Sequence, residues 1–184
     1  MVIAGVAVAV VGAFMKAAGQ NPVDDRRKQV PPPAHMLFCN LCCCNVAKGS
    51  KHCRTCDKCI LHFDHHCKWL NNCVGSKNYH SFFLLVSTIL FQVFAQMVAG
   101  SYLLWWAVSN KDKADALFSS DRFLTSLDRT HFIAAISVYL VAGAALCYLV
   151  GELFFFHIIL INRGITTYDY ILGERHRANK ATDT

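Results

Sequence analysis

Cysteine and histidine residues are concentrated in one short segment of the chain. Nine of the ten cysteines lie between Cys39 and Cys73, and two Cys-x-x-Cys pairs begin at Cys39 and Cys53. Two cysteines at this spacing can direct both sulfur atoms toward one zinc ion at about 2.3 Å. The segment offers eight metal ligands: Cys39, Cys42, His52, Cys53, Cys56, Cys59, His66 and Cys73. One pair alone could be a redox motif, but eight ligands predict two tetrahedral zinc sites. Spacing alone leaves open which ligands share an ion.

The predicted zinc sites are structural. Three thiolates and one neutral histidine leave a bound zinc ion with a net negative charge and with no open position for water. The segment around these residues is polar and lacks the periodicity of a long helix or strand. Metal binding is therefore expected to replace a hydrophobic core and to be inseparable from folding. We find no internal repeat in the sequence.

The segment from Cys39 to Phe82 reads C-x2-C-x9-H-C-x2-C-x2-C-x4-D-H-H-C-x5-C-x4-N-x3-F. This pattern resembles the cysteine-rich domain of the DHHC protein S-acyltransferases, or palmitoyltransferases, at every motif position. The signature quartet runs from Asp64 through His65 and His66 to Cys67. The resemblance implies one zinc ion bound by Cys39, Cys42, His52 and Cys59, and a second bound by Cys53, Cys56, His66 and Cys73. It leaves Cys67, His65 and Asp64 without a zinc ion to bind.

These three remaining residues are suited to acyl transfer. The thiolate is the reactive form of cysteine, and a free thiol with a pKa of about 8.5 is mostly protonated at neutral pH. His65 can accept the proton of Cys67, and Asp64 can orient His65. The alternative is that His65 and Asp64 only cap the zinc knuckle. The resemblance implies a two-step reaction in which Cys67 takes a palmitoyl group from palmitoyl-CoA and passes it to a cysteine of a substrate protein.

A long acyl chain is expected to lie between membrane helices, because burial contributes about 0.8 kcal/mol per methylene group. The candidates for lining such a cavity are aromatic: Phe82, Phe83, Phe91, Phe94, Trp105, Trp106, Tyr139 and Phe154 to Phe156. For any single candidate, packing against lipid or a neighbouring helix is the simpler explanation. Cationic side chains are expected to bind the phosphates of CoA, but the sequence does not indicate which ones.

Other residues support the resemblance or depart from it. Asn78 belongs to the motif, and the run from Thr166 and Thr167 to Asp169 resembles the family's T-T-x-E motif, with aspartate for glutamate. In the family these threonines approach the catalytic histidine, and a helix cap is the alternative role.

Two features depart from the family pattern. Lys68 replaces the usual proline after Cys67; its positive charge favours the thiolate of Cys67, but the backbone there loses the fixed φ angle of a proline. Three cysteines lie outside the motif. Cys43 and Cys44 are expected to be idle thiols, and Cys147 is expected to pack as a small apolar residue.

Three apolar runs could hold this cysteine-rich domain at a membrane. Phe82 to Val108 contains no Lys, Arg, Asp or Glu, and Phe132 to Ile161 contains only Glu152. Both exceed the roughly 20 residues that a helix needs to cross a bilayer. Val2 to Ala18 is interrupted only by Lys16, and a signal peptide is its alternative. We favour a membrane span, because no positive charge precedes the run and a signal peptide would send the cysteines into an oxidising lumen.

The distribution of charge predicts an orientation. The net charge is +6, and basic residues are concentrated between Lys16 and Lys77 and after the last apolar run, whereas residues 109–130 are balanced. Loops rich in Lys and Arg stay on the cytosolic side. The cysteine-rich domain and the tail are therefore expected in the cytosol. Attraction to anionic lipid is the simpler role for most of these basic residues.

The expected architecture is all-α, with three transmembrane helices and a cytosolic, loop-rich domain that binds two zinc ions. The predicted segments are a span at 1–19, a linker at 20–34 with extended prolines at 31–33, the cysteine-rich domain at 35–79, a span at 80–108, a lumenal loop at 109–130, a span at 131–161 and a cytosolic tail at 162–184, disordered after Gly173. One span precedes the motif where the family has two, so we expect the chain to lack the first family span.

The predicted function is S-acyl transfer in the endoplasmic reticulum or the Golgi membrane. The expected partners are membrane lipid, long-chain acyl-CoA and cysteine-containing substrate proteins, and no nucleic acid. The alternative is a membrane-anchored zinc scaffold with little catalysis, which the missing span and Lys68 would favour. The sequence does not name the protein substrates or the preferred acyl length.

Overall fold

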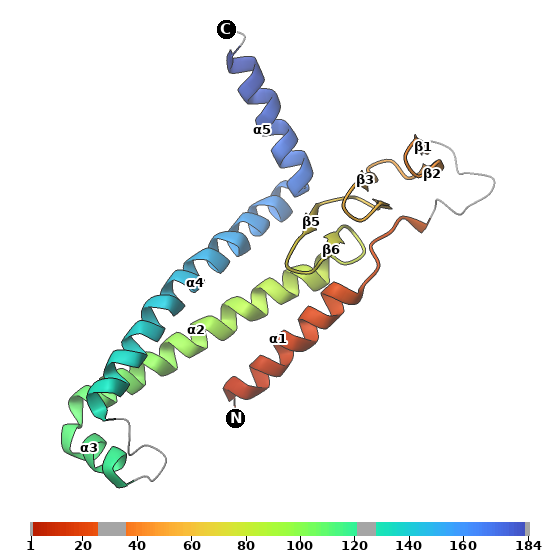
Figure 1. The fold of residues 1–184 in the computed structure, drawn as a ribbon. Coiled ribbons are helices and arrows are strands. Elements are labelled where there is room, and N and C mark those ends of the chain that lie inside the picture. Colours follow the sequence, from red (N-terminus) through yellow and green to blue (C-terminus); the bar gives the residue numbers. More distant parts are fainter. Residues whose placement is uncertain (1, 26–35, 121–127, 183–184) are drawn as a thin grey trace.

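The computed structural model describes residues 2–25, 36–120 and 128–182 (Figure 1). Within these ranges the chain is mostly helical. The helices are α1 (Val2–Gly19), α2 (Tyr79–Ser109), α3 (Lys111–Ser120), α4 (Arg129–Arg163) and α5 (Thr167–Thr182). The cysteine-rich domain lies between α1 and α2 in the sequence and beside the start of α2 in space (Figure 1).

Two described helices, α2 and α4, are long and apolar enough to cross a membrane. They cover the spans predicted at 80–108 and 131–161. α4 begins after Asp128, whose side chain accepts a hydrogen bond from the backbone N–H of His131 at 2.8 Å. It ends at Arg163, and the following Gly164 has a left-handed φ of 63°, the conformation that commonly ends a helix. The apolar part of α1, Ala7–Gly19, is shorter.

α2 packs against both α1 and α4 (Figure 1). The small side chains of Ala13 and Ala17 let α1 approach α2 closely, and they are buried in one cluster with Phe82, Leu85 and Val86. This cluster lies at the end of α2 that adjoins the cysteine-rich domain. The packing of α1 therefore places its C-terminus beside that domain.

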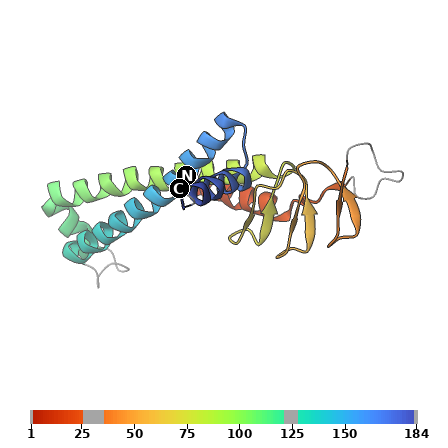
Figure 2. The ribbon, with the colours of Figure 1, turned by 90° about the horizontal axis from the view of Figure 1, so that it is seen from above.

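The cysteine-rich domain consists of three antiparallel hairpins that lie in a row (Figure 2). The paired strands are β1 (Leu37–Cys39) with β2 (Cys44–Val46), β3 (Lys51–Cys53) with β4 (Lys58–Ile60), and β5 (His65–Cys67) with β6 (Asn72–Val74). Each strand has three residues, which is too short for the alternating pattern that would reveal it in the sequence.

The three hairpins are a structural repeat, so the expectation of no internal repeat is wrong. The first strand of each hairpin ends on a cysteine, and Cys39, Cys53 and Cys67 follow one another at the same interval of 14 residues. A four-residue turn comes next, and its last residue has a left-handed φ in all three hairpins: 48° at Cys43, 49° at Asp57 and 47° at Asn71. The repeat combines this cysteine interval with a shared backbone shape, although unlike side chains occupy the last turn position.

The linker is docked on the domain where the structure describes it. Val23 forms a β-bridge with Ile60, and the backbone N–H of Asp24 donates to the carbonyl of Cys59 at 3.0 Å. The buried carboxylate of Asp24 accepts bonds from the backbone N–H of Ala47 at 2.7 Å and from the Ser50 hydroxyl at 2.8 Å. The predicted extended segment at 31–33 lies outside the described residues.

Two segments predicted as loop or disorder contain helices. In the predicted loop at 109–130, α3 buries Ala114 and Phe118 one turn apart, and Phe118 packs on Phe132 of α4 with ring centroids 5.4 Å apart. α5 continues past Gly173 to Thr182, so the prediction of disorder there is wrong. A polar helix such as α5 has no apolar stripe to reveal it, and its start depends on the cap described below.

Candidate functional site

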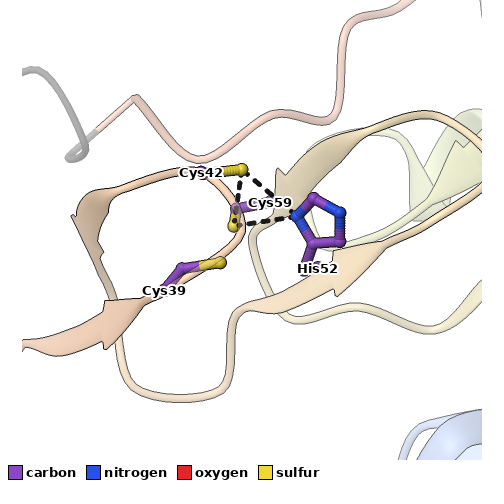
Figure 3. Close-up of side chains that lie close together, drawn as sticks. All are labelled: Cys39, Cys42, His52 and Cys59. Atoms are coloured by element: carbon purple, nitrogen blue, oxygen red, sulfur yellow. Dashed lines mark hydrogen bonds between the residues drawn. The ribbon is translucent and has the colours of Figure 1, made fainter.

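The first cysteine–histidine cluster joins the first two hairpins (Figure 3). Cys39 and Cys42 belong to the first hairpin, whereas His52 and Cys59 are direct partners across β3 and β4. The Sγ atom of Cys42 lies 3.2 Å from Nδ1 of His52 and 3.5 Å from Sγ of Cys59. The other ring nitrogen of His52, Nε2, faces a carboxylate oxygen of Asp57 at 3.4 Å. Such an outer carboxylate is what orients a histidine that binds metal.

The second cluster repeats the first, one hairpin further along the chain. Cys53 and Cys56 come from the second hairpin, and His66 and Cys73 are direct partners across β5 and β6. The Sγ atom of Cys56 lies 3.3 Å from Nδ1 of His66 and 3.4 Å from Sγ of Cys73. Each site thus links one Cys-x-x-Cys turn to the histidine and cysteine of the next hairpin.

Both clusters fit zinc. The ligand atoms of each set lie within 4.8 Å of one another. A tetrahedral site with zinc–sulfur bonds of about 2.3 Å has edges of about 3.8 Å, close to the separations found here. None of the ten cysteines forms a disulfide. The two clusters are the ligand sets that the family resemblance implies.

Cys67 occupies in the third hairpin the place that Cys39 and Cys53 occupy in the first two. Leu70 replaces the second cysteine of the pair, and β6 leads into α2 instead of another hairpin. A third site of the same kind therefore cannot form. The backbone N–H groups of Trp69 and Leu70 lower the pKa of Cys67, as the equivalent groups lower that of Cys39 and Cys53. The turn of the third hairpin thus surrounds the free thiol of Cys67 with the same backbone groups that surround the zinc-binding cysteines of the first two hairpins.

Asp64 and His65 are joined by a hydrogen bond, and Cys67 lies two residues after His65 in the same strand. Nδ1–H of His65 donates to Oδ2 of Asp64 at 2.6 Å. Burial alone would lower the pKa of His65, but the hydrogen bonds to Asp64 and Cys67 outweigh it and raise this pKa to about 9. Burial alone would raise the pKa of Cys67, but hydrogen bonds from His65 and from the backbone of Leu70 lower it. Both shifts favour a thiolate beside an imidazolium ion.

Thr167 binds the carboxylate of Asp64, which is 2% exposed. Its backbone N–H donates to Oδ1 and its hydroxyl donates to Oδ2, both at 2.8 Å. Burial would raise the pKa of Asp64, but the bonds from His65 and Thr167 lower it. Thr167 and His65 therefore share one carboxylate oxygen, Oδ2 of Asp64, which connects the threonine to the histidine.

Thr166 and Asp169 cap α5. The Thr166 hydroxyl accepts a hydrogen bond from the backbone N–H of Asp169 at 3.1 Å and donates to its carboxylate at 2.7 Å. The same carboxylate accepts from the backbone N–H of Thr166 at 3.3 Å. This reciprocal pattern is a capping box, the alternative that the sequence left open. The two adjacent threonines therefore have different roles.

Two further residues of the site were missed in the sequence. His157 of α4 is 1% exposed, and its Nδ1 lies 2.9 Å from the hydroxyl of Tyr79 at the start of α2. The ring centroid of His157 lies 5.9 Å from that of His65. A titratable residue inside an apolar run is rare and usually functional. That signal could have identified His157.

The catalytic candidates adjoin an apolar surface. Cys67 is 8% exposed and belongs to the buried cluster that contains Ala17 of α1 and Phe82 of α2. Phe82 also packs edge-to-face on His65, with ring centroids 5.2 Å apart. The thiol therefore faces the ends of the helices and not open solvent.

The predicted cavity residues do not gather in one place. Phe83 stacks on Phe154 at 5.3 Å beside the Cys67 cluster. Phe94 and Phe155 instead line a separate groove of about 440 Å³ between α2 and α4, together with Cys147. Several of the candidates are exposed: Phe91, Phe94, Trp105, Tyr139 and Phe155.

Asn78 and Asn72 position the third hairpin. Asn78 is fully buried, donates to the carbonyl of Cys73 at 2.8 Å and accepts from the backbone N–H of Gly75 at 2.9 Å, which shapes the turn into α2. The side chain of Asn72, opposite Cys67 in the hairpin, donates to the carbonyls of Ala18 and Gln20 at 3.0 and 2.8 Å. It thereby fastens the end of α1 to the candidate nucleophile's hairpin. Lys68 is exposed.

The fold and the site define a class of protein: mostly helical, with two candidate membrane spans, a two-site zinc-knuckle domain and an Asp-His-Cys series at the helix ends. Sequence comparison agrees, since the family model described as DHHC palmitoyltransferase matches residues 34–174. The chain is 41% identical over 159 residues to probable protein S-acyltransferase 20 of Arabidopsis thaliana, covering 83% of this chain and 22% of that protein. It is 33% identical over 139 residues to palmitoyltransferase ZDHHC5-A of Danio rerio, covering 76% of this chain and 16% of that protein.

A third relative, palmitoyltransferase erf2 of Emericella nidulans, is 33% identical over 146 residues, covering 76% of this chain and 22% of that protein. The chain belongs to the DHHC palmitoyltransferase family. It spans about a fifth of the length of these curated relatives.

Proposed function

We propose that this chain is a protein S-acyltransferase in which Cys67 carries the acyl group. The observation that supports this most directly is the hydrogen-bonded series from Thr167 through Asp64 to His65. His65 lowers the pKa of Cys67, whose thiol lies next to apolar helix ends. The thiolate is the nucleophile, and the lowered pKa of Cys67 favours this form. The names of the relatives describe the same activity.

In the first step, the Cys67 thiolate attacks the carbonyl carbon of a long-chain acyl-CoA. The bond from that carbon to the CoA sulfur breaks, and the departing CoA thiolate takes the proton from the His65 imidazolium. The product is a thioester on Cys67, with His65 neutral. Asp64 keeps Nδ1 of His65 protonated and so leaves the other ring nitrogen for proton transfer.

In the second step, the thiol of a substrate cysteine gives its proton to His65 and attacks the thioester. The bond to Cys67 breaks, and Cys67 leaves as a thiolate beside the newly formed imidazolium. The site returns to its starting state, and the net reaction exchanges one thioester for another. The same base therefore serves both steps.

Two structural zinc ions complete the proposed site. One would be held by Cys39, Cys42, His52 and Cys59, and the other by Cys53, Cys56, His66 and Cys73. With four protein ligands each, they would supply no chemistry at the carbonyl carbon. Their effect is to fix the three hairpins, and with them the place of Cys67.

The proposed placement puts α1, α2 and α4 across an endomembrane, of the endoplasmic reticulum or the Golgi, with the zinc domain in the cytosol. The basic residues of the domain and the tail support this orientation, and the packing of α1 on α2 supports α1 as a third span. The burial of Cys67 beside helix ends supports a long, palmitoyl-like acyl chain, since each buried methylene contributes about 0.8 kcal/mol.

The test is acylation of the chain itself. Wild-type protein in membranes is incubated with labelled palmitoyl-CoA, and thioester label is identified by its release with hydroxylamine. We expect label on Cys67, its loss in Cys67→Ser, and its retention in Cys43→Ser, which removes an exposed cysteine outside the zinc clusters. Equal labelling of wild type and Cys67→Ser would exclude Cys67 as the carrier. Absence of label from a protein that holds two zinc ions would favour the scaffold alternative.

A further inference from the structure

The hydrogen-bonded pair of His157 and Tyr79 lies behind His65 and is not used in the proposed steps. His157 is 1% exposed, and its Nδ1 lies 2.9 Å from the Tyr79 hydroxyl. Its ring packs edge-to-face on Phe82 at 5.0 Å and lies 5.9 Å from His65. Phe82 packs on His65 as well, at 5.2 Å. Phe82 and His157 therefore both lie against the ring of His65, and the hydroxyl of Tyr79 forms a hydrogen bond with His157.

We propose that His157, held by Tyr79, is a positioning residue that keeps the ring of His65 aligned between Asp64 and Cys67. The effect on acyl transfer rests on the proposed function, whereas the effect on the thiol can be measured without it. With 1% of its surface exposed, His157 cannot touch a substrate protein or CoA. It acts through His65.

The C-terminal part of the chain then holds the catalytic pair at two points. His157 of α4 lies against the ring of His65, and Thr167 of α5 binds the carboxylate of Asp64. Both contacts join residues far apart in sequence, and both depend on how α4 is seated on α2. This arrangement predicts that loosening His157 changes the rate of reaction at Cys67 without changing the zinc sites.

A third metal site is the competing explanation, because ligand atoms of Asp64, His65 and His157 lie within 4.8 Å of one another. The donor atoms are already engaged. Asp64 accepts from His65 and twice from Thr167, and Nδ1 of His157 bonds with Tyr79. An ion would have to break several of these bonds. The cluster is better explained as a hydrogen-bonded support.

The test compares His157→Ala, Tyr79→Phe and the double variant with wild type in membranes. Tyr79→Phe keeps the ring and removes only the hydroxyl that bonds with His157. The control is His80→Ala, an exposed neighbour in the first turn of α2. Two rates are measured for each protein, acylation of Cys67 by palmitoyl-CoA and alkylation of Cys67 by N-ethylmaleimide, with peptide mass spectrometry resolving Cys67 from the other cysteines.

We expect His157→Ala to slow both reactions by about ten- to a hundredfold, the effect of displacing a catalytic group by about 1 Å. We expect Tyr79→Phe to slow them by about fivefold, the factor for one hydrogen bond of about 1 kcal/mol. The second change should add little in the His157→Ala background, because both changes act through one contact. The KM for palmitoyl-CoA and the zinc content should match wild type. His157→Asn, which keeps an acceptor for the Tyr79 hydroxyl, should recover part of the rate.

Three kinetic outcomes and one zinc-inhibition outcome would overturn the proposal. The kinetic outcomes are rates within twofold of wild type in both variants, effects that add in the double variant, and losses that only follow loss of zinc. If added zinc inhibits wild type but not His157→Ala, the metal-site explanation replaces it. If wild type is never acylated but the alkylation pattern is as expected, the proposed function fails and the positioning role of His157 stands.

Discussion

Thr167→Val removes one hydrogen bond from the carboxylate that orients the candidate base. The Thr167 hydroxyl donates to Oδ2 of Asp64 at 2.8 Å, and valine has the same shape without the donor. A hydrogen bond to a charged group contributes about 1.5–3 kcal/mol. Asp64 keeps the bonds from His65 and from the backbone N–H of Thr167, so we expect the lower end of this range. About 1.5 kcal/mol corresponds to a roughly tenfold slower acylation of Cys67.

Thr166→Val is the matched control, because it makes the same change one residue earlier. Thr166 bonds with Asp169 in the capping box and not with Asp64. Losing this cap costs α5 about 1 kcal/mol, so trypsin should cut faster at Arg175 and Arg177 while acylation stays within twofold of wild type. The assay is the initial rate of hydroxylamine-sensitive labelling per zinc-loaded molecule. Equal rates for the two variants would refute the separate roles assigned to the two threonines.

Three other predictions concern the pH profile, the metal and the third turn. The pKa of Cys67 is lowered and that of His65 is raised to about 9. Alkylation of Cys67 should therefore have its midpoint below that of an ordinary cysteine, and His65→Gln should move this midpoint to higher pH; an unmoved profile would count against the ion pair. Chelation should expose the domain to protease, and Cys53→Ser should reduce the zinc content while Cys67→Ser leaves it intact; equal zinc in both would contradict the ligand sets. Asn71→Val should destabilise the domain by about 1–2 kcal/mol and Asn71→Gly should not, since φ is 47° there; equal thermal unfolding would show that this conformation is not needed.

The zinc ligands show which features of the site can be predicted from local sequence and which cannot. Their residue types and the two Cys-x-x-Cys spacings indicate metal binding from the sequence alone, because a knuckle is a local structure. The pairing of ligands depends on strand register, which sets His52 opposite Cys59 and His66 opposite Cys73. Spacing could not specify that register, since each strand has only three residues. The 14-residue interval of Cys39, Cys53 and Cys67 is present in the sequence, but the structure shows that each interval begins a hairpin.

The sequence by itself determined the family, the eight candidate zinc ligands and the two long apolar helices. It also identified Asp64, His65 and Cys67 as the candidate catalytic residues. Each of these depends on residues close together in the chain or on composition averaged over a run. The tertiary structure decided what surrounds the thiol. Thr167 and Asp64 are 103 residues apart, and Tyr79 and His157 are 78 apart. Their contacts arise from the seating of α4 on α2, a packing arrangement that no local pattern encodes.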